Sequence, residues 1–175
     1  NFLNSLLEKR IISPKHLWIL GVQDEICQEL EQMNNSQGNL DSNAVSIKKW
    51  MAEGVHVMFK KEVQSEKFEM DLSGPSYLSI DMDVGSMSSI YSARFMNSFG
   101  LKKDGFLKLL NRVSKFVESS NRPLVGMDIM ELDIHFLEVA KKGDVNDYTE
   151  QIIEEIFKIF VNKGSKNLNK KSFIH

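Results

Sequence analysis

Four short apolar runs, separated by amphipathic segments, constrain the fold of this chain more than any other feature. They cover residues 16–22, 55–59, 76–83 and 123–132. Each run is predicted to be a strand, and the continuous apolar run 16–22 suits a strand that is buried on both faces, as in a parallel sheet. Strands that alternate with helices indicate βαβ units. The predicted fold class is therefore α/β: a three-layer sandwich around a mostly parallel, doubly wound sheet.

The segments between the runs carry the periodicity of helices. Apolar spacing predicts helices over residues 1–9, 24–33, 43–53 and 102–118, and a further helix that opens at Asp147. Asp147-Tyr148-Thr149-Glu150 has the spacing of a capping box, with the aspartate in the cap position. The stretches 84–100 and 133–146 lack this periodicity and are predicted to be irregular. A loop as long as residues 84–100 is uncommon unless it is functional.

Length and composition indicate a single domain. A chain of 175 residues can bury one genuine core, predicted over residues 1–164, with residues 165–175 as a flexible basic tail. The net charge of -2 gives no electrostatic case for a nucleic-acid partner, and no apolar stretch has membrane-spanning length. The single cysteine, Cys27, has the spacing of a core residue. It also excludes an intrachain disulfide and fits a reducing compartment, so we expect a cytoplasmic protein.

The start of the chain lacks an initiator methionine and the order of residues that marks a signal peptide. We therefore expect the chain to be an internal fragment of a longer protein, or a processed one.

Two aspartates end the third apolar run and are the first candidates for chemistry. Asp81 and Asp83 lie two residues apart, so an extended strand would place both carboxylates on one face. Two such charges repel unless a cation or hydrogen-bond donors compensate them. Oxygen ligands favour Mg or Mn, so one reading is a divalent metal site. The other reading is that one aspartate caps the following turn and the other is solvated.

The fourth run contributes two further acidic residues. Asp128 lies within the run and is expected to be a buried hydrogen-bond acceptor. Glu131 follows the run, and by itself it could be a surface residue or an acceptor that orders the next loop. The histidines show no metal-ligand spacing, and His16 and His56, which flank or lie within strands, are expected to serve in packing.

These segments resemble one known family. Ser79-Ile80-Asp81-Met82-Asp83 looks like the Ser-Phe-Asp-x-Asp signature of the ureohydrolases, which include arginase, agmatinase and formiminoglutamase. The segment Gly126 to Glu131 is similar to their Gly-x-Asp-hydrophobic-x-Glu motif, and Asp144 to Thr149 resembles the start of their last helix. Order and spacing agree over nearly the whole chain, which matches the C-terminal half of the family's single arginase-like α/β domain.

The resemblance implies a role for each candidate. Asp81 and Asp83 would be ligands of a pair of Mn ions, which activate water for attack on a guanidinium-type carbon. Glu131 would bind the cationic group of the substrate, and no catalytic side chain beyond the metal-activated water is expected. The implied function is hydrolysis of a C–N bond in a small cationic amidine or guanidine, by a homo-oligomer with no nucleic-acid or membrane partner.

The chain also departs from the family's pattern. Ser86-Met87 stands where the family usually has a third aspartate and a proline, and its Gly-Gly-Leu substrate loop is reduced to Ser98-Phe99-Gly100-Leu101. The metal ligands of the family's first half are absent, so we expect no activity from this chain alone. Two alternatives stay open: a catalytically inactive arginase-fold protein that serves in binding or assembly, and a plain α/β binding module with one Mg-type site.

Overall fold

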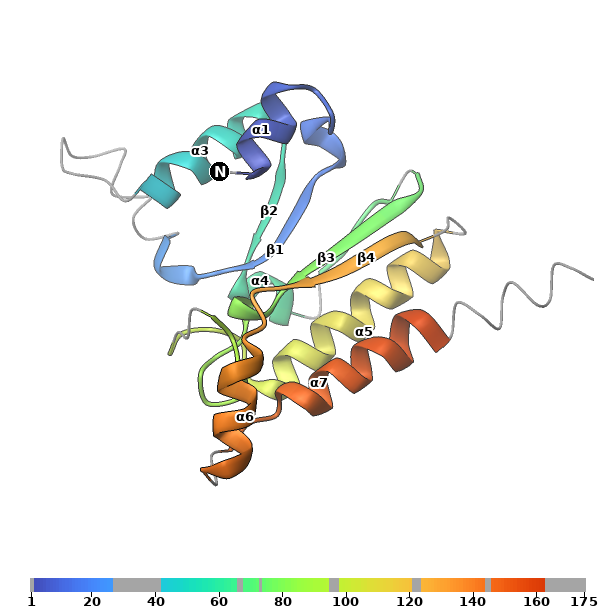
Figure 1. Ribbon diagram of the computed structural model, residues 1–175. Coiled ribbons are helices and arrows are strands. Elements are labelled where there is room, and N and C mark those ends of the chain that lie inside the picture. The colour runs from blue at the N-terminus through green and yellow to red at the C-terminus, as the bar shows by residue number, and fades with distance from the viewer. Residues whose placement is uncertain are drawn as a thin grey trace, which may run out of the picture. The chain divides into compact units, whose positions relative to one another are not determined.

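The computed structural model describes residues 2–26, 42–65, 68–72, 74–94, 98–120, 124–143 and 146–162. The chain divides into two compact units, residues 1–68 and residues 69–175. Each unit contains one pair of hydrogen-bonded parallel strands (Figure 1). Over the described stretches, no helix is both long and apolar enough to cross a membrane.

The first unit builds its core between its helices and its two strands. Its elements are α1 (Phe2–Glu8), the 3-10 helix η1 (Pro14–His16), β1 (Trp18–Val22), α3 (Ser42–Glu53), β2 (His56–Phe59) and α4 (Lys60–Gln64). The buried cluster consists of Leu7, Ile47, Trp50 and Val55. The Trp50 indole N–H donates to Asn4 Oδ1 at 2.7 Å, which joins α3 to α1. The apolar stripes of these two helices therefore face the same core.

Most elements predicted for the first unit are confirmed, with differences in detail. Within α3, Met51 is 43% exposed. His16 is exposed in η1 rather than packed. His56 is exposed as well, but its ring stacks on that of Trp18, with the ring centroids 4.0 Å apart. Only the first turn of the predicted helix 24–33 is described, and Cys27 lies outside the described residues.

The second unit places two long helices against one strand pair. Its elements are β3 (Ser76–Asp81), the 3-10 helix η2 (Met82–Val84), α5 (Lys103–Ser119), β4 (Leu124–Met130), α6 (Ile134–Lys142), α7 (Thr149–Ile156) and the π-helical turn η3 (Phe157–Asn162). In Figure 1, α5 and α7 run side by side along the strand pair. The buried residues include Ile80, Met82, Phe106, Leu109, Leu110, Val113, Ile152 and Ile156.

The third strand is buried on one face only. Tyr77, Ser79 and Asp81 are exposed, whereas Ile80 between them is 5% exposed. Because side chains alternate along a strand, this pattern belongs to a half-buried strand. One face of β3 is therefore exposed in the described structure.

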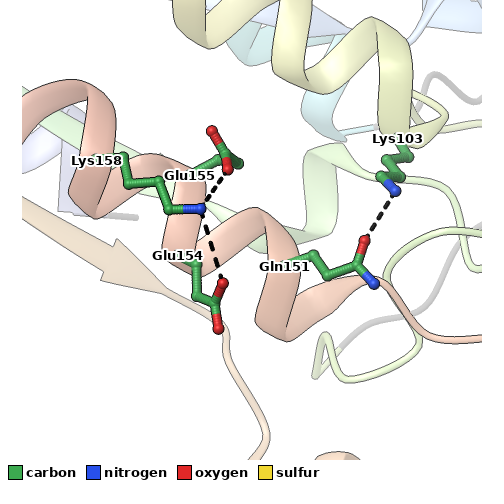
Figure 2. Close-up of polar contacts among 5 residues, drawn as sticks. All are labelled: Lys103, Gln151, Glu154, Glu155 and Lys158. Carbon is green, nitrogen blue, oxygen red and sulfur yellow. Dashed lines mark hydrogen bonds and ion pairs between the residues drawn. The ribbon is translucent and has the colours of Figure 1, made fainter.

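Polar contacts on the surface also join α5 to α7 (Figure 2). Lys103 Nζ donates to Gln151 Oε1 at 2.8 Å and lies 4.2 Å from the centroid of the Tyr148 ring. Beyond α7, Lys158 of η3 pairs with Glu155 at 2.7 Å and with Glu154 at 3.9 Å. Exposed pairs of this kind contribute little to stability, so the buried apolar faces hold the two helices together.

Two sequence-based predictions for the second unit are wrong. The stretch 133–146, expected to be irregular, contains α6, whose first turn is capped by Asp133: its Oδ1 accepts from His135 N at 2.9 Å and from Phe136 N at 3.2 Å. The last helix begins at Thr149 with Tyr148 as its N-cap residue, whose own side chain makes no cap hydrogen bond, whereas the Asp147 carboxylate accepts from the Thr149 backbone N–H at 3.0 Å. Asp147 therefore lies before the helix and forms no capping box. The loop predicted over residues 84–100 is confirmed where it is described.

Candidate active site

The carboxyl ends of β3 and β4 bring two of the predicted residues to one edge. Asp81, the last residue of β3, is the register partner of Met130, the last residue of β4. Glu131 follows Met130 directly, so Asp81 and Glu131 lie at adjacent strand ends. In open parallel sheets, ligands bind outside the carboxyl ends of the strands. This edge is therefore the place in the second unit where a ligand site is expected.

Asp81 and Asp83 do not lie on one strand face as the sequence analysis predicted. The Asp83 backbone N–H donates to Asp81 Oδ1 at 2.9 Å, which turns the chain from β3 into η2. The strand therefore ends at Asp81, and Asp83 lies in a 3-10 turn. The capping role that we considered as an alternative is thus confirmed for Asp81. Among the described residues β3 pairs only with β4.

The two aspartates fit a metal ion only as part of a ligand set. Their carboxylate oxygens are donors of the type that Mg and Mn prefer, and Asp81 retains a second oxygen besides the one that caps the turn. Within the part of the chain that the structure describes, no three His, Cys, Asp or Glu residues are grouped so that they could hold a metal. A complete site would require further ligands.

Glu131 has a backbone conformation that is rare for its residue type. Its φ is 57°, in the left-handed region that favours glycine. The surrounding loop holds it there: the Arg94 backbone N–H donates to the Glu131 carbonyl at 2.7 Å, and Ala93 forms an antiparallel bridge with Leu132. Such strain costs on the order of 1 kcal/mol or more and is concentrated at functional sites. The conformation therefore marks Glu131 as a candidate functional residue independently of any sequence motif.

Asp128 is a hydrogen-bond acceptor, as predicted, but only one of its oxygens has a partner in the described structure. The exposed Tyr77 hydroxyl donates to Asp128 Oδ2 at 2.9 Å, whereas Oδ1 is buried without a hydrogen-bond partner among the described residues. The Tyr77 ring crosses Gly126, where an added Cβ would lie 2.8 Å from Cε2. Hydrogen bonding to Asp128 raises the pKa of the Tyr77 phenol above its ordinary value of 10.0.

A pH titration should detect this Tyr77 hydrogen bond. Because the folded-state pKa is raised, its contribution to stability is complete below the unfolded-state pKa of about 10 and is lost as the pH rises through the folded-state pKa. The free energy of unfolding of the wild type should therefore fall more steeply in this alkaline range than that of Tyr77→Phe. Urea unfolding of both proteins across that range measures the difference, and equal slopes would contradict the assignment.

Comparison with known proteins identifies the family of the chain. The sequence profile of the Arginase family matches residues 1–143. The chain therefore belongs to the arginase family. Among curated protein sequences, none matches significantly.

Solved structures show the same fold. The chain is similar to a formimidoylglutamase from Bacillus subtilis subsp. subtilis str. 168, with a TM-score of 0.60 and 17% identity, over 94% of this chain and 46% of that one. It is also similar to the proclavaminate amidino hydrolase of Streptomyces clavuligerus, with a TM-score of 0.57 and 19% identity, over 90% and 47%. A formiminoglutamase from Trypanosoma cruzi, solved with Mn2+, gives a TM-score of 0.53 and 14% identity, over 90% and 58%.

These comparisons confirm the predicted class, an α/β arginase-like fold with parallel strands. The chain spans about half the length of the first two of these structures.

Two features of this region were missed by the sequence analysis. Asp147 is predicted only as a helix cap, but besides accepting from the Thr149 backbone N–H at the helix start its carboxylate also binds the loop that precedes α5. Gly100 was noted only as the remnant of a family motif, yet an added Cβ there would lie 2.3 Å from the Gly85 carbonyl carbon. The sequence signal for that close approach was a glycine between Phe99 and Leu101, shortly before the start of α5.

Proposed function

We propose that the whole protein containing this chain is a Mn-dependent hydrolase that cleaves a C–N bond in a linear amidine or guanidine. In this proposal Asp81 and Asp83 contribute metal ligands, and Glu131 binds the cationic group of the substrate. The observation that carries the proposal is the location of Asp81 and Glu131 at adjacent strand ends in an arginase-family fold.

Each residue type suits its proposed role. Carboxylate oxygens favour Mn among the common divalent ions, and a bound metal would lower the pKa of water enough to supply a nucleophile near neutral pH. Glu131 offers two oxygens in a plane, which matches the paired N–H donors of an amidine or guanidinium group. Its fixed backbone would hold the substrate carbon in one orientation, and orientation of this kind contributes strongly to rate.

The names of two similar structures support the substrate class. One is a formimidoylglutamase and another a proclavaminate amidino hydrolase, so both names denote a carbon that bears two nitrogens. A cationic group of this kind is what a single carboxylate such as that of Glu131 is suited to bind.

A second candidate is an inactive member of the same family that serves in binding or assembly. It is favoured by Ser86-Met87, which stands where the family usually has an aspartate and a proline. The test uses the whole protein, reconstituted with Mn, and measures hydrolysis of arginine, agmatine and formiminoglutamate. Mn-dependent hydrolysis of any of them supports the enzyme, whereas a folded, Mn-loaded protein that hydrolyses none supports the inactive alternative.

The chain of 175 residues alone should bind Mn weakly and hydrolyse none of these compounds. Metal affinity depends on the number of ligands and on the groups that orient them, and Asp81 and Asp83 supply only part of a binuclear site. Calorimetric titration with Mn and an assay of the purified chain measure both properties. Substantial hydrolysis of arginine or agmatine by this chain would contradict the assignment of an incomplete site.

A further inference from the structure

Asp147 binds the loop between the two candidate motifs more extensively than a helix cap would. Its Oδ1 accepts from the backbone N–H of Tyr91 at 3.1 Å, from the backbone N–H of Thr149 at 3.0 Å and from the Thr149 hydroxyl. Its Oδ2 accepts from the Ser92 hydroxyl at 2.5 Å. Ser92 and Thr149 are completely buried. One carboxylate therefore accepts hydrogen bonds from two segments that lie 55 or more residues apart in the sequence.

The same loop is fixed to the starts of both long helices. The Ser89 carbonyl accepts from the Tyr148 backbone N–H at 3.0 Å, which joins the loop to α7. The Ser89 hydroxyl accepts from the Lys103 backbone N–H at 2.9 Å, which joins it to α5. Lys103 also contacts the start of α7 through its side chain (Figure 2). On this side the loop is therefore held by hydrogen bonds to the starts of α5 and α7.

On its other side the loop contacts the segment that contains Glu131. The Ser92 carbonyl accepts from the Asp133 backbone N–H at 2.8 Å, and the Arg94 N–H donates to the Glu131 carbonyl at 2.7 Å. Ser92 thus makes both contacts: its hydroxyl donates to Asp147, and its carbonyl accepts from the segment that contains Glu131. The path from Asp147 to the strained residue passes through one buried serine.

We infer that Asp147 is a positioning residue for Glu131: through Ser92 and the Ala93–Leu132 bridge it holds the Glu131 backbone in the orientation that substrate binding requires. This role rests on the proposed function of Glu131. A carboxylate suits the task because it only accepts, and its two oxygens here face donors alone. An asparagine in its place would remove the charge from the acceptor and would turn an N–H group either towards the backbone N–H donors or towards the Ser92 hydroxyl, which would then have to accept, so the attachment of the loop would be weakened.

The test is Asp147→Asn in the whole protein, with Asp71→Asn, an exposed aspartate of the same unit, as the charge-matched control. Because Glu131 would be displaced, Asp147→Asn should raise KM for the fastest cationic substrate by about tenfold or more, with Mn content unchanged. Hydrogen exchange should speed up at the amides of Tyr91, Arg94 and Asp133 but not in the core of α5. The control should change neither KM nor exchange.

Two further variants separate positioning from a general effect on folding. Combined with Glu131→Gln, Asp147→Asn should change kcat/KM by less than about twofold more, because both changes act on one interaction. A full additional loss in that background would overturn the positioning role. If Asp147→Asn does not fold, Ser92→Ala removes only the Oδ2 contact and should give a smaller KM increase with the same exchange pattern.

The failure of this inference is distinguishable from the failure of the proposed function. An unchanged KM in both Asp147→Asn and Ser92→Ala, with a lowered kcat/KM in Glu131→Gln, would overturn the positioning role alone. An unchanged kcat/KM in Glu131→Gln would overturn the proposed function and, with it, the role of Asp147.

Discussion

Replacing Glu131 by glutamine should lower kcat/KM of the whole protein at least about 100-fold, because a neutral amide removes a charge-assisted pair of hydrogen bonds and the orientation that it provides. Mn content should stay at the wild-type value, since the proposed metal ligands are Asp81 and Asp83. Steady-state kinetics with a cationic amidine or guanidine substrate, together with metal analysis of the same sample, measure both quantities.

Glycine at position 131 supplies the matched control for the backbone. A φ of 57° carries no steric penalty for glycine, so Glu131→Gly should be as stable as the wild type or more stable by up to about 1 kcal/mol. It should nevertheless be as inactive as the glutamine variant. If Glu131 only orders the following loop, the glutamine variant should instead be destabilised and normally active, which would contradict the proposed role.

Replacing Gly100 by alanine should destabilise the unit of residues 69–175 by about 3 kcal/mol, the upper end of the range for overpacking. An added Cβ would lie 2.3 Å from both the carbonyl carbon and the oxygen of Gly85, and 2.6 Å from Ser86 N. These are backbone atoms, and they cannot rotate away as a side chain can. The Ser86 N–H also donates to the Leu101 carbonyl at 2.8 Å, so the clash would break that contact directly after η2.

Gly74→Ala is the matched control for this prediction. No heavy atom lies within 4 Å of a Cβ added at Gly74, so its effect should stay within about 0.5 kcal/mol. Urea unfolding of both variants and the wild type gives the comparison. Equal stability of the two alanine variants would show that residues 85 and 100 do not approach each other as closely as the structure has them.

The local predictions that succeeded depend on periodicity. The apolar spacing of α5 and the short apolar runs of β1 to β4 are properties of neighbouring residues, and the elements appear within a few residues of their predicted bounds. The error over residues 133–146 has a local cause as well. Asp133 followed by Phe136, Leu137 and Ala140 carries a cap and an apolar face, and that signal was available in the sequence.

The candidate site was predictable only in part. Asp81 and Glu131 come at the ends of apolar runs, which predicted that both lie at strand ends. The parallel pairing of β3 and β4 puts those two ends side by side. The prediction for Asp83 was wrong because it continued the alternation of strand side chains past Asp81, where β3 ends. One hydrogen bond, from the Asp83 N–H to the Asp81 carboxylate, ends the strand there. Alternation along the sequence cannot reveal where such a bond interrupts it.

The sequence by itself determined the α/β class, the order of the four strands with α1, α3, α5 and α7 before, between and after them, and the two acidic segments at strand ends, because each depends on patterns among residues close together in the chain. Only the tertiary structure decided the left-handed conformation of Glu131, the close approach of Gly100 to Gly85, and the attachment of Asp147 to Tyr91 and Ser92. These features arise where segments distant in sequence meet. Their hydrogen bonds and steric contacts exist only after the core has brought those segments together, so they leave no periodic signal in the chain.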